Sequence, residues 1–208
     1  MIQDLSSLEL VKTAKDIEGY PFIITPGKYQ TLTHVTDQST QVNIIANPYL
    51  YYTLGLCGET GELIDAIKKS YRISKDIRDI GPKIIREVGD VTWYSVRFQT
   101  LHMPSNVAIF MARNQDYLMD NNMPEEYYTT EGGILLAAYN ADKFASKAFY
   151  DVLLGEYDSA LDHAIQTGYH ALEVSRKLGV KDSHVLKTNL IKLYKRLEEG
   201  TIKSHGTS

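Results

Sequence analysis

Two pairs of acidic residues dominate the chemistry of this sequence. Glu59 and Glu62 form one pair and Glu87 and Asp90 the other, and the partners in each pair are three residues apart. Both pairs lie in segments with helical periodicity, and residues three apart share one face of a helix. Like charges among apolar neighbours cost free energy unless a cation lies between them. The pattern predicts an oxygen-rich site for Mg²⁺, or alternatively Mn²⁺, and the competing interpretation is ordinary solvated carboxylates.

These segments also resemble a known signature. GETGEL followed by REVGD is similar to the signature of the MazG-like nucleoside triphosphate pyrophosphohydrolases, which is Glu-Glu-x-x-Glu, a spacer and Glu-x-x-Asp. Glu59 and Glu62 match the second and third acids, and Glu87 and Asp90 match the last two. Gly58 stands where the first Glu of the signature belongs, which leaves four acids as metal ligands. The form GLCGETGEL resembles phage-type members of the family.

The resemblance implies a fold and a reaction. Its fold would be an all-α helical bundle of the MazG-like type. The reaction would be Mg²⁺-dependent hydrolysis of a nucleoside triphosphate, with a deoxynucleotide preferred, to the monophosphate and pyrophosphate in nucleotide-pool editing. Glu59 and Glu62 are the expected catalytic residues, and Glu59 is a candidate for the base that takes a proton from water. Family members form dimers or tetramers, so a homo-oligomer is expected unless an internal duplication substitutes.

The C-terminal segment offers partners for a triphosphate. NLIKLYKRLEEG resembles the ending of many MazG-like proteins, and Asn189, Lys192, Lys195 and Arg196 match it. Three of them, Asn189, Lys192 and Arg196, are spaced by three and four residues, so one helix face would present an amide and two cations. Phosphates need such partners beside a metal. The alternative is a solvated basic face on a terminal helix.

Three further residues are candidates for contacts with the base. Trp93 and Tyr94 follow Asp90 by about one turn and could stack on the nucleobase of the substrate. Core packing is the competing role for these two residues. The position of Gln30 before the acidic helix resembles the first helix of the family, which helps to enclose the base. A surface helix is the alternative there.

Hydrophobic periodicity predicts a single all-α domain over residues 1–208. It comprises an N-terminal extension with the first helices (1–48), a metal-binding half (49–120) and a second half with the phosphate-binding terminal helix (125–200). The helix order of the second half repeats that of the first, which indicates a tandem duplication that has lost its carboxylate pairs. Two runs of amphipathic helices that merely look alike are the alternative. Helices are expected at 48–72, 83–101, 106–120, 132–154, 156–179 and 183–200.

Bulk properties exclude several classes of protein. The net charge of −4 gives no basic surface for nucleic acid. No apolar run approaches the length of about 20 residues that spans a membrane, and no signal peptide is recognisable. We therefore expect a cytoplasmic protein, located in the host cytoplasm if phage-encoded. The functional alternative to the enzyme is a catalytically lapsed helical module of the same fold that binds a nucleotide or another protein.

Overall fold

The computed structural model describes residues 11–20, 23–37, 47–72, 76–102 and 131–201, and within them the chain is all-helical, as predicted. The helix expected at 106–120 lies outside the described residues. The described elements are α1 (Ala14–Glu18), α2 (Pro26–Thr36), α3 (Pro48–Arg72), the 3-10 helix η3 (Ile77–Ile80), α4 (Gly81–His102), α7 (Glu131–Leu154), α8 (Tyr157–Lys177) and α9 (Asp182–Glu198).

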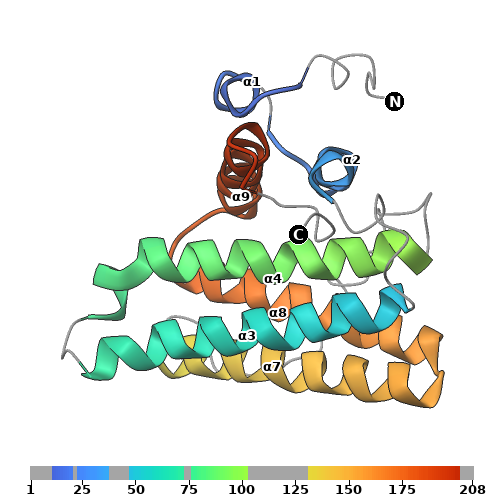
Figure 1. Cartoon of the computed structure of the whole chain (residues 1–208). Helices are drawn as coiled ribbons and strands as arrows, with labels where there is room; N and C mark the ends of the chain where they lie inside the picture. Colours follow the sequence, from blue (N-terminus) through green and yellow to red (C-terminus); the bar gives the residue numbers. More distant parts are fainter. Residues whose placement is uncertain (1–10, 21–22, 38–46, 73–75, 103–130, 202–208) are drawn as a thin grey trace.

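Four long helices form a bundle (Figure 1). The helix α3 packs on α4 and on α7, while α8 packs on α4 and α7 and closes the ring. Small residues allow α7 and α8 to approach each other closely. Ala141, Ala145 and Ala148 of α7 and Ala160 and Ala164 of α8 are completely buried. Closely spaced helices with few voids follow from this alanine-rich contact.

A second layer covers α4 on the side away from α7. It consists of α1, α2 and α9 (Figure 1), and α9 contacts α1, α2 and α4. Tyr29 of α2 and Tyr194 of α9 are fully buried within it. The hydroxyl of Tyr194 donates to the carbonyl of Leu32 at 3.4 Å. Through this layer, the last helix of the chain lies directly over the second acidic pair.

The two hairpins lie side by side, as a tandem duplication would require. α3 and α4 form one hairpin and α7 and α8 the other. The second hairpin carries an aromatic cluster between its helices. Phe144 stacks on His163 and His170, with ring centroids 5.7 and 5.5 Å apart. A common origin of the two hairpins stays a prediction.

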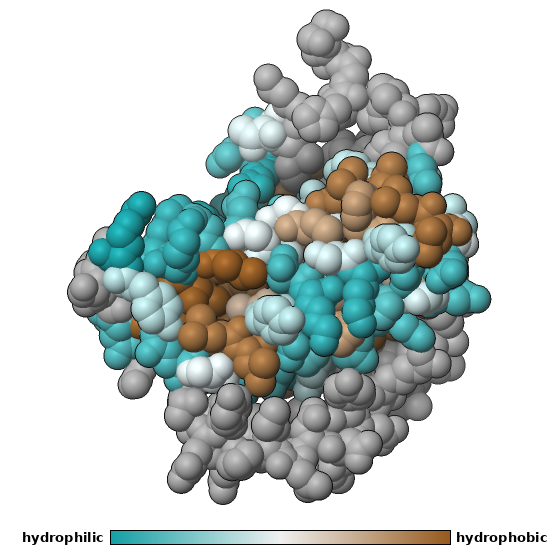
Figure 2. All heavy atoms as spheres, turned by 90° about the horizontal axis from the view of Figure 1, so that it is seen from below, coloured by the Kyte–Doolittle hydropathy of each residue, from teal (hydrophilic) through white to brown (hydrophobic). Residues whose placement is uncertain are grey.

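Apolar side chains also reach the surface of the bundle. Figure 2 shows the face seen from below, where apolar groups gather in two areas between polar ones. The exposed large aliphatic residues of α3 and α7 are Leu54, Ile64, Leu135, Leu153 and Leu154. No described helix is both long enough and apolar enough to cross a membrane.

Candidate metal centre

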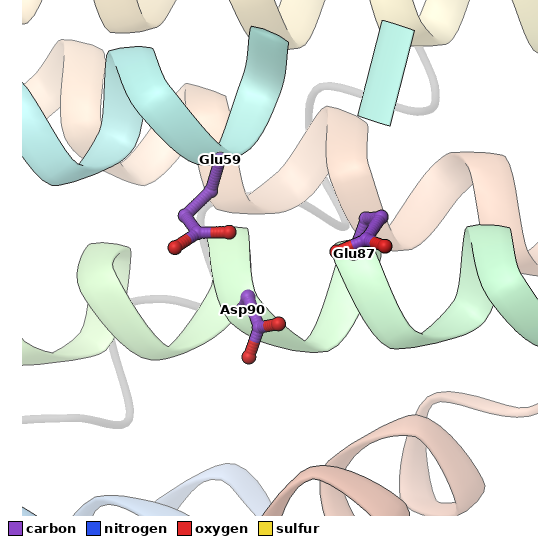
Figure 3. A group of neighbouring side chains, drawn as sticks. All are labelled: Glu59, Glu87 and Asp90. Carbon is purple, nitrogen blue, oxygen red and sulfur yellow. The ribbon is translucent and has the colours of Figure 1, made fainter. Parts of the chain in front are cut away.

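Three of the four predicted acids converge between α3 and α4 (Figure 3). Glu59 comes from α3, and Glu87 and Asp90 come from successive turns of α4. Each offers a carboxylate oxygen, and these three oxygens all lie within 4.8 Å of one another. We call these residues the acidic triad. Glu87 is buried and the other two are half-buried, so the triad is partly shielded from water.

Glu62 does not join the triad. Its side chain is exposed, and it lines an adjoining pocket together with Glu87. Three residues turn a helix by about 300°, so the side chains of Glu59 and Glu62 point about 60° apart. Glu59 faces α4 (Figure 3), whereas Glu62 lines the pocket beside the triad.

The triad holds more negative charge than its surroundings neutralise. The pKa of Glu59 is raised from its usual 4.5 to about 7, first by burial and then by the charges of Asp90 and Glu62. Lys192 opposes this shift, and Glu87 adds a smaller increase. A cation among the three carboxylates would offset the repulsion between their charges, whereas the larger effect of burial would remain.

Asp90 is held by the last helix of the chain. The amide Nδ2 of Asn189 donates to its Oδ1 at 2.9 Å, and the ammonium of Lys192 pairs with the same oxygen. The hydroxyl of Tyr29 donates to Oδ1 of Asn189 at 2.6 Å, which fixes the orientation of the amide. Asn189 and Tyr29 are both buried. Lys192 therefore acts as an internal counter-ion of Asp90.

Gly89 is the reason that α9 can come this close to α4. A Cβ atom at Gly89 would lie 2.9 Å from Cβ of Asn189 and 3.0 Å from its Nδ2. Carbon atoms in contact are normally about 3.5–4.0 Å apart. A larger residue would displace the amide that holds Asp90.

The other two predicted phosphate ligands on α9 are not brought to the triad. Lys195 is exposed and forms an ion pair with Glu18 of α1, with a Nζ–Oε1 distance of 2.9 Å. Arg196 is exposed on the following position of α9. Lys192 thus lies at the acidic triad, whereas Lys195 lies at the N-terminal layer.

The aromatic candidates differ from one another in position. Trp93 is buried, and its Nε1 donates to Oγ1 of Thr36 at 3.2 Å, which indicates a core role. Tyr94 is half-buried and lies across Gly55 of α3, where an added Cβ would be 2.1 Å from the ring. Burial, together with Tyr51 and Glu59, raises its pKa well above the usual value. Of these two aromatic residues, Tyr94 is the one that lies next to the triad and is partly accessible to solvent.

Gln30 lies away from the acids. Its Nε2 donates to Oγ1 of Thr100 at 2.8 Å. Thr100 follows Asp90 by ten residues, which is about 15 Å along α4. The structure therefore gives Gln30 a contact between α2 and α4, and its predicted part in enclosing the base stays a prediction.

Three cations that the sequence patterns did not assign to the site lie next to the triad. Lys69, Lys83 and Arg86 line the pocket that adjoins Glu87. Arg86 also donates from Nη2 to Oε1 of Glu87 at 3.0 Å. The sequence signal was that Arg86 directly precedes Glu87 and that Lys83 precedes it by about one turn of the same helix.

Comparison with known proteins found no match. No family model, no curated protein and no solved structure is significantly similar to this chain.

Proposed function

We propose that this protein is a Mg²⁺-dependent nucleoside triphosphate pyrophosphohydrolase that releases the monophosphate and pyrophosphate. The observation that carries the proposal is the convergence of Glu59, Glu87 and Asp90, from two helices, with carboxylate oxygens within 4.8 Å of one another. The motif resemblance supplies the reaction. The geometry supports it, because three of the four acids that match the signature meet in space.

The chemistry of the donor set fits Mg²⁺ or Mn²⁺. Both ions prefer carboxylate oxygens and retain waters, and three carboxylates leave positions open for water and phosphate. The raised pKa of Glu59 points the same way in part, since the charges of Asp90 and Glu62 add to the larger effect of burial. When bound, the metal would offset phosphate charge and make a coordinated water more acidic.

Several residues of the chain would then have separate roles in the reaction. Water attacks the α-phosphorus, the bond from this phosphorus to the oxygen bridging to the β-phosphate breaks, and pyrophosphate leaves with that oxygen. Glu59 would take the proton of the attacking water. Asn189 holds Asp90 in place. Tyr94 offers a ring beside the triad on which a base can stack.

The test is an assay of purified protein with Mg²⁺ and each canonical ribonucleotide and deoxynucleotide plus dUTP, following pyrophosphate and orthophosphate. We expect pyrophosphate, and loss of turnover by a factor of at least about 100 in Glu87→Gln and Asp90→Asn. Glu199→Gln, an exposed acid at the end of α9, is the matched control. Orthophosphate as the only product would refute the reaction.

The second candidate is a nucleotide-binding module without catalysis. It is favoured by the placement of Glu62 outside the triad and by Gly58 at the position of the first acid of the signature. Mg²⁺-dependent nucleotide binding without release of either phosphate product would support it. The same assay therefore separates the two candidates.

We also propose that the protein forms a homo-oligomer. The exposed aliphatic side chains on α3 and α7 support this proposal, because apolar patches of this kind often mark contact surfaces (Figure 2). The α7–α8 hairpin already covers α3–α4 within one chain, so a dimer is expected in preference to a tetramer. Light scattering during gel filtration measures the mass, and a monomer would refute the proposal.

A further inference from the structure

A pocket with mixed charges opens directly beside the acidic triad. Its cations are Lys69 of α3 and Lys83 and Arg86 of α4. Its acids are Glu62 and Asp65 of α3 and Glu87, which it shares with the triad. Gly58 and Gly61 also line it. An added Cβ at either glycine would meet no atom within 4 Å, so α3 presents bare backbone and open space on this side.

Three kinds of side chain follow one another along the α3–α4 hairpin. Lys83 precedes Glu87 by four residues on α4, and Tyr94 follows Asp90 by four, which is about 6 Å in each direction. On α3, Lys69 lies on the cationic side of Glu59, and Tyr94 packs across α3 on the other side. The order is therefore cations, acidic triad and aromatic ring.

This order matches the parts of a nucleoside triphosphate. Terminal phosphates require cations, the bond to be broken lies near the metal, and the base favours an aromatic surface. We infer that the pocket binds the two terminal phosphates, which leave as pyrophosphate, and that Lys69, Lys83 and Arg86 bind them. The inference rests on the proposed function for its substrate, and it gives that substrate a direction along the hairpin.

The existing ion pairs of the pocket do not block an anion. Asp65 pairs with both Lys68 and Lys69, so Lys68 remains as its partner when Lys69 turns to a phosphate. Lys68 is mostly exposed and Lys69 and Asp65 are at least a third exposed, so solvent screens both pairs and little is lost when Lys69 turns to a phosphate. Arg86 is also more than half exposed and touches Glu87 through one nitrogen, which leaves its other donors for a second acceptor.

Gly58 gains a role in this arrangement. The signature that the sequence resembles has Glu at this position, and here the position lines the pocket. A carboxylate there would add negative charge where the terminal phosphates are expected. The glycine keeps the pocket open and more favourable for an anion.

The test is calorimetric titration of the full chain with inorganic pyrophosphate in the presence of Mg²⁺. Lys69→Met and Lys83→Met are each expected to weaken binding about tenfold, as the loss of one charge-assisted hydrogen bond does. Lys68→Met is the matched control, because Lys68 adjoins Lys69 and pairs with the same Asp65 but does not line the pocket. It should bind within a factor of two of the unmodified protein.

The remaining outcomes are decisive. Equal binding in Lys69→Met, Lys83→Met and Lys68→Met overturns the inference, as does a loss confined to Arg196→Met, which would place the phosphates on α9. If hydrolysis persists in that case, the proposed function stands without this pocket. Pocket-dependent pyrophosphate binding without any hydrolysis supports the inference and refutes the catalysis. If the unmodified protein shows no binding and no hydrolysis, the inference and the proposed function are both refuted.

Discussion

The clearest test of the acidic triad is a substitution that should make the metal-free protein more stable. Glu59→Gln removes a carboxyl group whose pKa in the folded chain is about 7 but whose ordinary value is 4.5. Between these values the folded state retains a proton that the unfolded chain has released. The free energy of unfolding therefore falls as pH rises from about 4.5 to about 7, and the whole penalty is present above this window.

The magnitude follows from the shift. A displacement of this size corresponds to about 3 kcal/mol if taken in full. Glu59 is only half-buried, so solvent screening reduces the effect, and we expect about 1–2 kcal/mol. For a protein of this length, that is a rise in Tm of about 2–8 °C for Glu59→Gln at pH 8. Below about pH 4.5 the two proteins should have equal stability.

The assay is thermal denaturation in EDTA at pH 4.5, 6 and 8, repeated with Mg²⁺. Glu199→Gln is the control, because its side chain is exposed at the end of α9 and its charge is not among those that raise the pKa of Glu59. Mg²⁺ should stabilise the unmodified protein at pH 8 and have a much smaller effect on Glu59→Gln. A variant that gains nothing at pH 8, or gains equally at pH 4.5, would refute the electrostatic reasoning.

Three other substitutions test the surroundings of the triad. Lys192→Met should raise the affinity for Mn²⁺ severalfold in calorimetry, because the ammonium that competes with the metal for a triad oxygen is gone; weaker binding would contradict this. Gly89→Ala should lower the free energy of unfolding in urea by about 1–3 kcal/mol, because its Cβ would overlap Asn189; a more stable protein would contradict the close packing. Arg97→Leu should lower the free energy of unfolding in urea by about 3–5 kcal/mol, because it removes the guanidinium that pairs with the completely buried Asp37 at 2.7 Å. A decrease below about 1 kcal/mol would contradict the importance of this buried ion pair.

The long helices could be predicted closely from the sequence. Residues 48–72 were expected to form one helix, and α3 spans Pro48–Arg72. Proline is favoured in the first turn of a helix, so the start was marked locally. Gly155 and Gly179 stand at the ends of α7 and α8, where both have a φ of +78° that favours glycine. Such signals act within one or two turns and need no knowledge of the fold.

The site could be predicted only in part. The spacing of Glu87 and Asp90 placed both on one side of α4, and this much is a property of the helix itself. The same spacing placed Glu62 beside Glu59, but the neighbouring helix α4 faces only one of them. The sequence also could not decide which of Trp93 and Tyr94 lies in the core. Adjacent residues point about 100° apart, so the rotation of α4 in the bundle decides which one is in the core.

By itself, then, the sequence determined the helices, their ends and the acids that could bind a metal, because all three depend on residues within a few positions of one another. Tertiary structure alone decided which side chains meet. Lys195 pairs with Glu18 of α1, from the other end of the chain, and so turns away from the triad. Lys69 and Lys83 come together at one pocket because α3 and α4 pack at a particular register. Rotation and register of packed helices depend on contacts across the whole fold, and no local pattern records them.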